Sequence, residues 1–180
     1  MALSNYIPRY TVTDYEQWEG DWELWSGVPV SMSPSPDIEH QLLSGELYVR
    51  LRKALEESEC LECTVVQDVD WRVSEDTVLR PDLSIICQHK NSGFIEESPP
   101  MVVEILSDST RQRDLLYKKD MYEKLGALCY LIVDPRAKTW SLFANGVNGF
   151  EVASLTNGLS LSPDCKISPV FDGLFEGSRS

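Results

Sequence analysis

Three short apolar runs limit this chain to a fold built around a β-sheet. They occupy residues 81–87, 101–106 and 128–133. Each run is too short for a typical core helix and has the apolar character of a strand that is covered on both faces. Strands of this kind need helices or a second sheet against them, so the rest of the chain must supply those layers.

Two longer segments have the periodicity of amphipathic helices. In residues 37–58 an apolar residue recurs every fourth position, which gives this helix one face for a core: Leu43, Leu47, Leu51 and Leu55. A second helix is predicted over residues 109–125, because Gly126 follows and glycine is common just past a helix end.

The remaining pattern predicts a layered fold. Strands are expected at residues 22–25, 28–32, 140–143 and 150–155. Residues 62–73 alternate with a change of phase near Asp68, which indicates one long strand or two strands with a bulge. Thr13 and Glu16 resemble a capping box and predict a short helix to about residue 18. We therefore expect one α/β or α+β domain over residues 1–180, with one mixed sheet, a core at about 13–143 and C-terminal strands to about 172.

The charge balance disfavours one class of nucleic-acid-binding protein. The chain has 16 Lys and Arg against 29 Asp and Glu, a formal net charge of −13 at pH 7. Tight, nonspecific coating of nucleic acid depends on many Lys and Arg contacts to phosphate, whereas a small basic site on an acidic body stays compatible. No run approaches the roughly 20 apolar residues of a membrane span. Residues 1–10 lack the apolar core of a signal peptide, so we expect a cytoplasmic protein without a membrane partner.

The five cysteines predict reduced thiols. They are Cys60, Cys63, Cys87, Cys129 and Cys165, an odd number in a chain large enough to fold without disulfides. Cys60 and Cys63 form one CxxC pair, but a structural zinc site needs two further ligands at similar spacing, and Cys87 and Cys129 fall in predicted strands. The interpretation favoured is small buried side chains without a metal or redox role.

Three charged residues stand where an apolar pattern should exclude them. Glu104 interrupts the apolar run at 101–106, and Asp82 begins the run before it. Burying an unpaired carboxylate costs several kcal/mol, so each of these groups needs a partner. If the two runs are antiparallel neighbours, Asp82 and Glu104 come close to each other.

The third charged residue is Lys118, in the helix at 109–125. At 100° per residue it lies within about 60° of Leu115, about 40° of Tyr122 and about 20° of Leu125, inside the stripe expected to face the sheet. A lysine in such a stripe requires a counter-charge, and Glu104 is the obvious candidate.

Two carboxylates and a lysine at the end of a central sheet match the needs of metal-dependent phosphodiester hydrolysis. Asp82 and Glu104 can hold a hard cation such as Mg²⁺ through oxygen. Lys118 can orient a water molecule or stabilise the phosphate in the transition state. The alternative from the pattern alone is a structural buried ion pair without a metal.

The same residues carry a resemblance to a known family. Residues 79–86, around Arg80-Pro81-Asp82, and residues 102–110, around Glu104, resemble the signature of the Uma-type restriction endonucleases of the PD-(D/E)xK nuclease superfamily. The similarity extends through Lys118 and residues 130–135, and upstream to Glu23 and His40. It covers roughly residues 13–143 and implies a restriction-endonuclease-like core.

The resemblance assigns roles residue by residue. It makes Asp82 the aspartate of the first half-motif and Glu104 the acidic residue of the second, both as ligands of Mg²⁺ or Mn²⁺. The lysine expected two positions after Glu104 is replaced by Leu106, and Lys118 from the following helix is the implied substitute. Glu23 is implied as a further carboxylate of the metal site, and His40 as a residue that orients water or contacts phosphate.

The resulting hypothesis is a metal-dependent endonuclease that hydrolyses DNA, with a homodimer as a further hypothesis. The rival is a catalytically inactive nuclease-fold scaffold or DNA-associated interaction module, which the acidic charge favours. A hydrolase of small phosphorylated substrates is a third class, but the sequence contains no Gly-rich phosphate loop.

Overall fold

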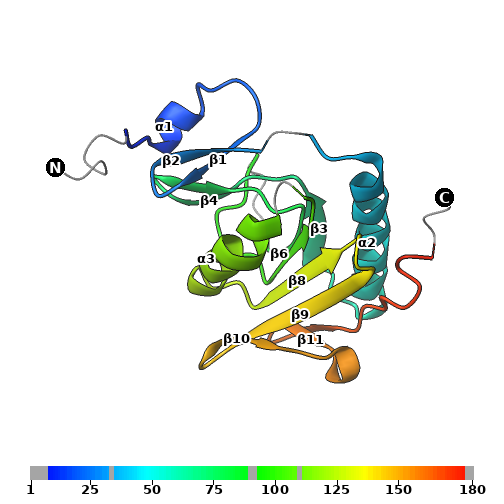
Figure 1. Ribbon diagram of the computed structural model, residues 1–180. Coiled ribbons are helices and arrows are strands. Elements are labelled where there is room, and N and C mark those ends of the chain that lie inside the picture. The colour runs from blue at the N-terminus through cyan, green and yellow to red at the C-terminus, as the bar shows by residue number, and fades with distance from the viewer. Residues whose placement is uncertain (1–7, 33–34, 89–92, 109–110, 177–180) are drawn as a thin grey trace.

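A six-stranded mixed sheet forms the centre of the molecule (Figure 1). The computed structural model describes residues 8–32, 35–88, 93–108 and 111–176. In spatial order the strands are β10 (Gly149–Val152), β9 (Thr139–Gly146), β8 (Cys129–Asp134), β7 (Met101–Ile105), β6 (Leu83–Cys87) and β3 (Cys63–Gln67). Only β7 and β8 run parallel; the other neighbours are antiparallel. This arrangement confirms the predicted mixed α+β class.

Helices cover both faces of this sheet. The long helix α2 (Ile38–Glu57) packs its four evenly spaced leucines against one face, where Val103 and Ile105 of β7 also point. The other face holds Val102 of β7, Tyr130 of β8 and Tyr122 of α3 (Lys119–Lys124). Because side chains alternate along a strand, Glu104 shares the second face with Val102. This alternation directs the carboxylate toward the helix that carries Lys118.

A second sheet lies beside the first, which corrects the prediction of one sheet. Its strands are β2 (Val28–Ser31), β1 (Trp22–Trp25), β5 (Thr77–Leu79) and β4 (Trp71–Ser74). The segment predicted as one strand or two with a bulge is divided between the two sheets, β3 in one and β4 in the other. Asp68, between them, has φ 52, so the chain turns sharply there.

The C-terminal region adds a small hairpin to the α2 side. After the short turn η3 (Leu155–Asn157), strands β11 (Leu159–Ser162) and β12 (Cys165–Ile167) pair with each other. Leu159, Leu161 and Ile167 belong to the same apolar core as α2. The hairpin therefore packs against the central unit of the fold.

The second predicted helix begins with unusual winding. Residues 109 and 110 lie outside the described residues, and Arg113–Lys118 form a π-helix, η2, that continues into α3. Asp114 and Lys118 are buried, whereas Leu115, Leu116 and Tyr117 are 37%, 57% and 58% exposed. The expectation that Leu115 lies on the buried stripe is therefore wrong, because the 100° rotation of an α-helix does not apply to π winding.

The N-terminal helix also differs from its prediction. Helix α1 (Val12–Tyr15) is capped by Thr11 and Asp14, with both bonds of a capping box, instead of by Thr13 and Glu16. Both pairs have the required three-residue spacing, so the sequence did not separate them. Among the described residues, no helix combines the length and the apolarity needed to cross a membrane.

Four cysteines form disulfides, contrary to the expectation of reduced thiols. Cys60 is bonded to Cys165, and Cys63 to Cys87. Cys129 is a buried free cysteine. The pairs lie 105 and 24 residues apart in sequence, and they meet because β12 returns to the end of α2 and β3 pairs with β6. Because the partners are brought together by tertiary structure, no local sequence pattern indicates which cysteines pair.

Candidate functional site

The antiparallel pairing of β6 and β7 brings the two predicted carboxylates together. Leu83 is opposite Val103 in the register, so Asp82 and Glu104 occupy the next position on their respective strands. Asp82 Oδ2 accepts a hydrogen bond from the backbone N–H of Ile105 at 2.6 Å. This bond fixes the aspartate against the strand that carries Glu104.

Lys118 reaches this pair from the adjacent helix. Its Nζ lies 2.8 Å from Glu104 Oε1 and 3.1 Å from Glu23 Oε1. It also donates to the carbonyl oxygen of Arg80 at 3.4 Å. The side chains of Lys118 and Glu104 are only 6% and 3% exposed, so the ion pair is shielded from water.

Glu23 and His40 contact different members of the site, Lys118 and Asp82 respectively. Glu23, on β1, accepts from the backbone N–H of Arg80 at 2.7 Å and from Trp25 Nε1 at 3.2 Å, in addition to its contact with Lys118. His40, in the first turn of α2, places Nε2 3.2 Å from Asp82 Oδ2. The structure thus groups all five predicted site residues, with Glu23 against the lysine and His40 against the aspartate.

Burial and crowding of carboxylates dominate the electrostatics. Burial raises the pKa of Glu104 well above its usual range; Lys118 opposes this effect, and Asp82, Asp114 and Glu23 reinforce it. Burial lowers the pKa of Lys118, but the charges of Glu104 and Glu23 outweigh it and the net pKa is raised. The lysine is therefore held as a cation among more negative groups than it can neutralise.

The pKa of His40 is also raised. Burial acts to lower this pKa, but the hydrogen bond and negative charge of Asp82, followed by the charges of Asp68 and Asp37, outweigh it. The other ring nitrogen, Nδ1, is buried and has no hydrogen-bond partner. His40 therefore interacts with the site through Nε2.

These residues line a cleft of about 720 Å³. Nine carboxylate side chains and four cationic side chains contribute to its lining, the cations being Arg80, Arg113, Lys118 and Arg136. Within the described parts of the chain, no group of three or more His, Cys, Asp or Glu side chains is arranged to hold a metal ion. Two carboxylates are nevertheless sufficient for Mg²⁺, which usually keeps several waters and takes other ligands from its substrate.

Three residues of the site were missed from the sequence. Arg80 anchors the loop before Asp82 through bonds to Asp70 and Asp21. Asp114 is buried in the cleft one turn before Lys118. Tyr122, expected only as a core residue, donates a hydrogen bond to Glu104 Oε1. For Asp114 and Tyr122 the sequence did contain a signal, because each is four residues from Lys118 and such residues share one side of a helix.

Comparison with known proteins places this geometry in a family. The Uma2 family model, described as putative restriction endonuclease, matches residues 12–171. The chain belongs to this family. A crystal structure of a putative nuclease belonging to DUF820, from Anabaena variabilis ATCC 29413, shares the fold with a TM-score of 0.71. That similarity has 15% sequence identity and covers 93% of this chain and 98% of the other. The search of curated proteins gives no match.

The family and the fold confirm two predictions made from the sequence. The Uma-type resemblance, expected over roughly residues 13–143, extends to residue 171 in the family match. The restriction-endonuclease-like core agrees with the structural neighbour. The chain is accordingly a nuclease-like member of the Uma2 family.

Proposed function

We propose that this protein is a metal-dependent endonuclease that hydrolyses DNA phosphodiester bonds, with Asp82 and Glu104 as ligands of Mg²⁺ or Mn²⁺. The observation that supports it most is the placement of Asp82, Glu104 and a buried Lys118 in one cleft. Three separate chain segments supply these groups. The membership of the Uma2 family is consistent with this reaction class.

The donor set fits a hard divalent cation. Asp82, Glu104, Glu23 and Asp114 are all close enough to influence the same buried lysine. One lysine cannot balance these carboxylates, and burial makes the imbalance more costly. A divalent cation bound between Asp82 and Glu104 would reduce that repulsion.

The cation, when bound, would supply positive charge to the phosphate and favour ionisation of a water molecule. Lys118 holds a second positive charge beside Glu104, where it stabilises the phosphate oxygens of the transition state. Glu23 and the carbonyl of Arg80 hold Nζ of Lys118 in place. His40 orients the carboxylate of Asp82 through Nε2, and the role with water or phosphate implied for it by the family resemblance stays a prediction.

The acidity of the cleft makes DNA binding depend on the cation. Carboxylates outnumber cationic side chains in the lining, so the metal-free protein repels a phosphodiester. Arg136 is 81% exposed at the side chain and lines the cleft, where it can contact a phosphate of the DNA backbone. We therefore expect DNA binding to be much weaker after a chelator has removed the metal.

A dimer and a cytoplasmic location complete the proposal. Leu115, Leu116 and Tyr117 expose apolar surface on η2, which two copies can share in a symmetric contact. Sedimentation velocity at tens of micromolar protein tests the dimer, and a single monomer boundary would contradict it. Fluorescent tagging in the native host tests the location.

The decisive experiment combines metal binding with DNA cleavage. Isothermal titration with Mn²⁺ is performed on wild type, Asp82→Asn, Glu104→Gln and, as a matched control, Asp120→Asn on the exposed face of α3. The first two variants should lose Mn²⁺ binding and nicking of supercoiled DNA, while Asp120→Asn keeps both. Equal binding and nicking by folded Asp82→Asn protein would overturn the proposal.

One observation favours the scaffold alternative. Three acceptors already surround Nζ of Lys118, namely Glu104 Oε1, Glu23 Oε1 and the Arg80 carbonyl, as in a structural ion pair. Wild-type protein that binds no Mn²⁺ and cuts no DNA would establish this alternative. The same titration therefore separates the two functions.

A further inference from the structure

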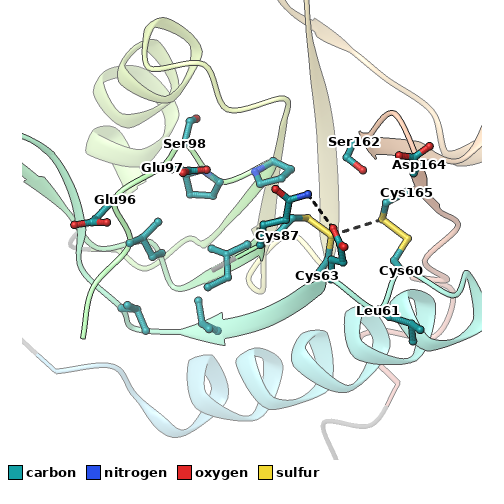
Figure 2. A pocket seen from close by; sticks show the side chains of 18 of the residues that line it. Cys60, Leu61, Cys63, Cys87, Glu96, Glu97, Ser98, Ser162, Asp164 and Cys165 are labelled. Atoms are coloured by element: carbon teal, nitrogen blue, oxygen red, sulfur yellow. Dashed lines mark hydrogen bonds between the residues drawn. A yellow bond between two sulfur atoms is a disulfide. The ribbon is translucent and has the colours of Figure 1, made fainter. Parts of the chain in front are cut away.

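Four of the five cysteines meet at the opposite end of β6 from the carboxylates. Cys60 follows the end of α2, Cys63 begins β3, Cys87 ends β6 and Cys165 begins β12. Figure 2 shows the two disulfides next to each other on the wall of a pocket. Four elements that are distant in sequence thus bring their sulfur atoms to one point.

The two disulfides are in direct contact. Sγ of Cys63 lies 3.8 Å from Sγ of Cys165, so each disulfide has one sulfur beside the other (Figure 2). In a tetrahedral zinc site with Zn–S bonds of about 2.3 Å, neighbouring sulfurs are about 3.8 Å apart. The contact between the disulfides already has the spacing of one edge of such a tetrahedron. After reduction, the bonded sulfurs need to separate to the same spacing.

The local backbone matches a metal-binding turn. Cys60 and Cys63 have the two-residue spacing common in structural zinc sites. The backbone N–H of Cys63 donates to the carbonyl of Cys60 at 3.1 Å, which closes a tight turn between them. Cys87 is opposite Cys63 in the β3–β6 register. One ligand pair therefore comes from a turn, and two further ligands come from separate strands.

The surroundings favour a cation over free thiolates. The pocket has a volume of about 760 Å³, and its described lining includes five carboxylates and no Lys, Arg or His: Glu59, Glu62, Glu96, Glu97 and Asp164. Four thiolates without a bound cation would repel one another and the five carboxylates. A soft divalent cation removes that repulsion, and thiolate sulfur prefers such ions to Mg²⁺ or Ca²⁺.

We propose that Cys60, Cys63, Cys87 and Cys165 form a redox-controlled Zn²⁺ site. The reduced protein holds one zinc ion through four thiolates, and oxidation converts these ligands into the two disulfides of the described structure. Disulfide sulfurs are not thiolate ligands, so oxidation removes all four ligands at once. The fifth cysteine, Cys129, is buried elsewhere and takes no part.

The oxidation step is balanced with a peroxide as the oxidant. Each disulfide forms from two thiolates with the loss of two electrons, so four electrons leave the site. Two molecules of hydrogen peroxide accept them: with four protons, their O–O bonds break and four water molecules form. The four Zn–S bonds break, two S–S bonds form and one Zn²⁺ is released. A dithiol reductant supplies the electrons for the reverse change.

Cobalt substitution tests the reduced site directly. Full-length protein is reduced with a phosphine, freed of metal with a chelator and titrated anaerobically with Co²⁺. We expect one Co²⁺ per chain, with the visible bands of tetrahedral cobalt and a thiolate charge-transfer band in the near ultraviolet. Added Zn²⁺ should remove both signals. Reduced, folded wild type without the tetrahedral spectrum would overturn the proposal.

Cysteine variants identify the ligands. The double variants Cys60→Ser/Cys165→Ser and Cys63→Ser/Cys87→Ser should lose the tetrahedral spectrum, whereas the matched control Cys129→Ser should keep it. Retention of the spectrum by either double variant would contradict the four-ligand assignment. If a variant fails to fold, the wild-type titration still decides, because it needs no substitution.

Peroxide treatment tests the switch. Zinc-loaded protein exposed to hydrogen peroxide should release one Zn²⁺ to a colorimetric indicator as four thiols per chain disappear. Peptide mapping should then recover the links Cys60–Cys165 and Cys63–Cys87. Zinc that stays bound after these thiols are oxidised, or a Cys60–Cys63 link as the main product, would contradict the proposal. Neither readout involves DNA, so the inference is independent of the proposed nuclease activity.

Discussion

The two ends of β6 hold their clustered side chains together by different kinds of bond. At the Asp82 end, charged side chains from three segments converge and are held by hydrogen bonds and ion pairs. At the Cys87 end, four sulfurs converge and are held by covalent bonds. A buried charge is conspicuous in a sequence because it interrupts an apolar run, whereas a buried cysteine resembles its apolar neighbours. The first site was therefore visible in the sequence, and the second required the fold.

The largest effect is expected from Lys118→Met at the charged end. This change leaves Glu104 and Glu23 buried without their shared cation and should lower the free energy of unfolding by about 3–5 kcal/mol. Urea unfolding of metal-free protein measures it. Lys124→Met, which removes an exposed i,i+4 pair with Asp120, is the control and should change stability by about 0.5 kcal/mol or less. Equal stability of Lys118→Met and wild type would show that the ion pair is dispensable.

At the sulfur end, Cys60→Ser/Cys165→Ser should have the next largest effect. The lost disulfide joins residues 105 positions apart, so its removal frees a long loop in the unfolded chain. We expect a loss of about 2–5 kcal/mol in the oxidised protein, measured by guanidinium unfolding without reductant. With a reductant and a chelator present, the difference from wild type should shrink. A variant that matches oxidised wild type would mean that the hairpin is held by its apolar contacts alone.

Glu104→Gln should act in the opposite direction to Lys118→Met. The pKa of Glu104 is raised by burial and by Asp82, Asp114 and Glu23, so the folded state binds this proton more tightly than the unfolded state does. Stability is then lost as the pH rises from the unfolded pKa toward the folded pKa. The variant removes that loss and leaves Lys118 paired with Glu23. Metal-free Glu104→Gln should be more stable than wild type at pH 7, by on the order of 1 kcal/mol.

The check on this variant is a series of unfolding curves from acid to neutral pH. Wild-type stability should fall relative to Glu104→Gln as the pH rises, and Asp120→Asn should follow wild type. A large destabilisation of Glu104→Gln at neutral pH would instead identify Glu104 as the indispensable partner of Lys118.

The smallest effect concerns His40. Its pKa is raised, because Asp82, Asp68 and Asp37 outweigh the opposing effect of burial. The stability from protonated His40 is present below its unfolded pKa of about 6.5 and is lost as the pH rises through the higher folded value. His40→Gln should remove this dependence, worth about 1 kcal/mol or less, because burial offsets much of the attraction within this largely buried pair. Proton NMR titration of the imidazole checks the direction, and a lower pKa in wild type than in Asp82→Asn would contradict it.

The strands and the carboxylate pair were predictable because they depend on short-range patterns. The apolar runs located β6, β7 and β8, and the antiparallel neighbourhood of β6 and β7 predicted the approach of Asp82 and Glu104. The position of Lys118 was also correct, although the helical count that predicted it assumed α winding. Tyr122 is on the buried side both in the predicted helix and in the structure. The wrong prediction that Leu115 is buried therefore did not change the predicted site.

The remaining features depend on contacts between distant segments. The second sheet was hidden because the turn at Asp68 separates β3 from β4 without a proline or glycine. Arg80 entered the sequence analysis only as part of the family motif, because its pairing with Asp21 and Asp70 depends on the fold. The disulfide partners of Cys60 and Cys63 were equally hidden, since β12 reaches them from the far end of the chain.

The π-helix at Arg113–Lys118 has an evolutionary consequence. A π turn is closed by a hydrogen bond to the fifth residue instead of the fourth, so it holds one residue more than an α turn. A π turn thus accommodates one inserted residue, and deleting one residue from this stretch would restore α winding while the segments before and after it keep their relative orientation. Asp114 and Lys118 would then be three residues apart in an α-helix and would still share one face. A single-codon insertion or deletion at this turn is thus absorbed by the change of winding, and the charged face that carries Lys118 is kept.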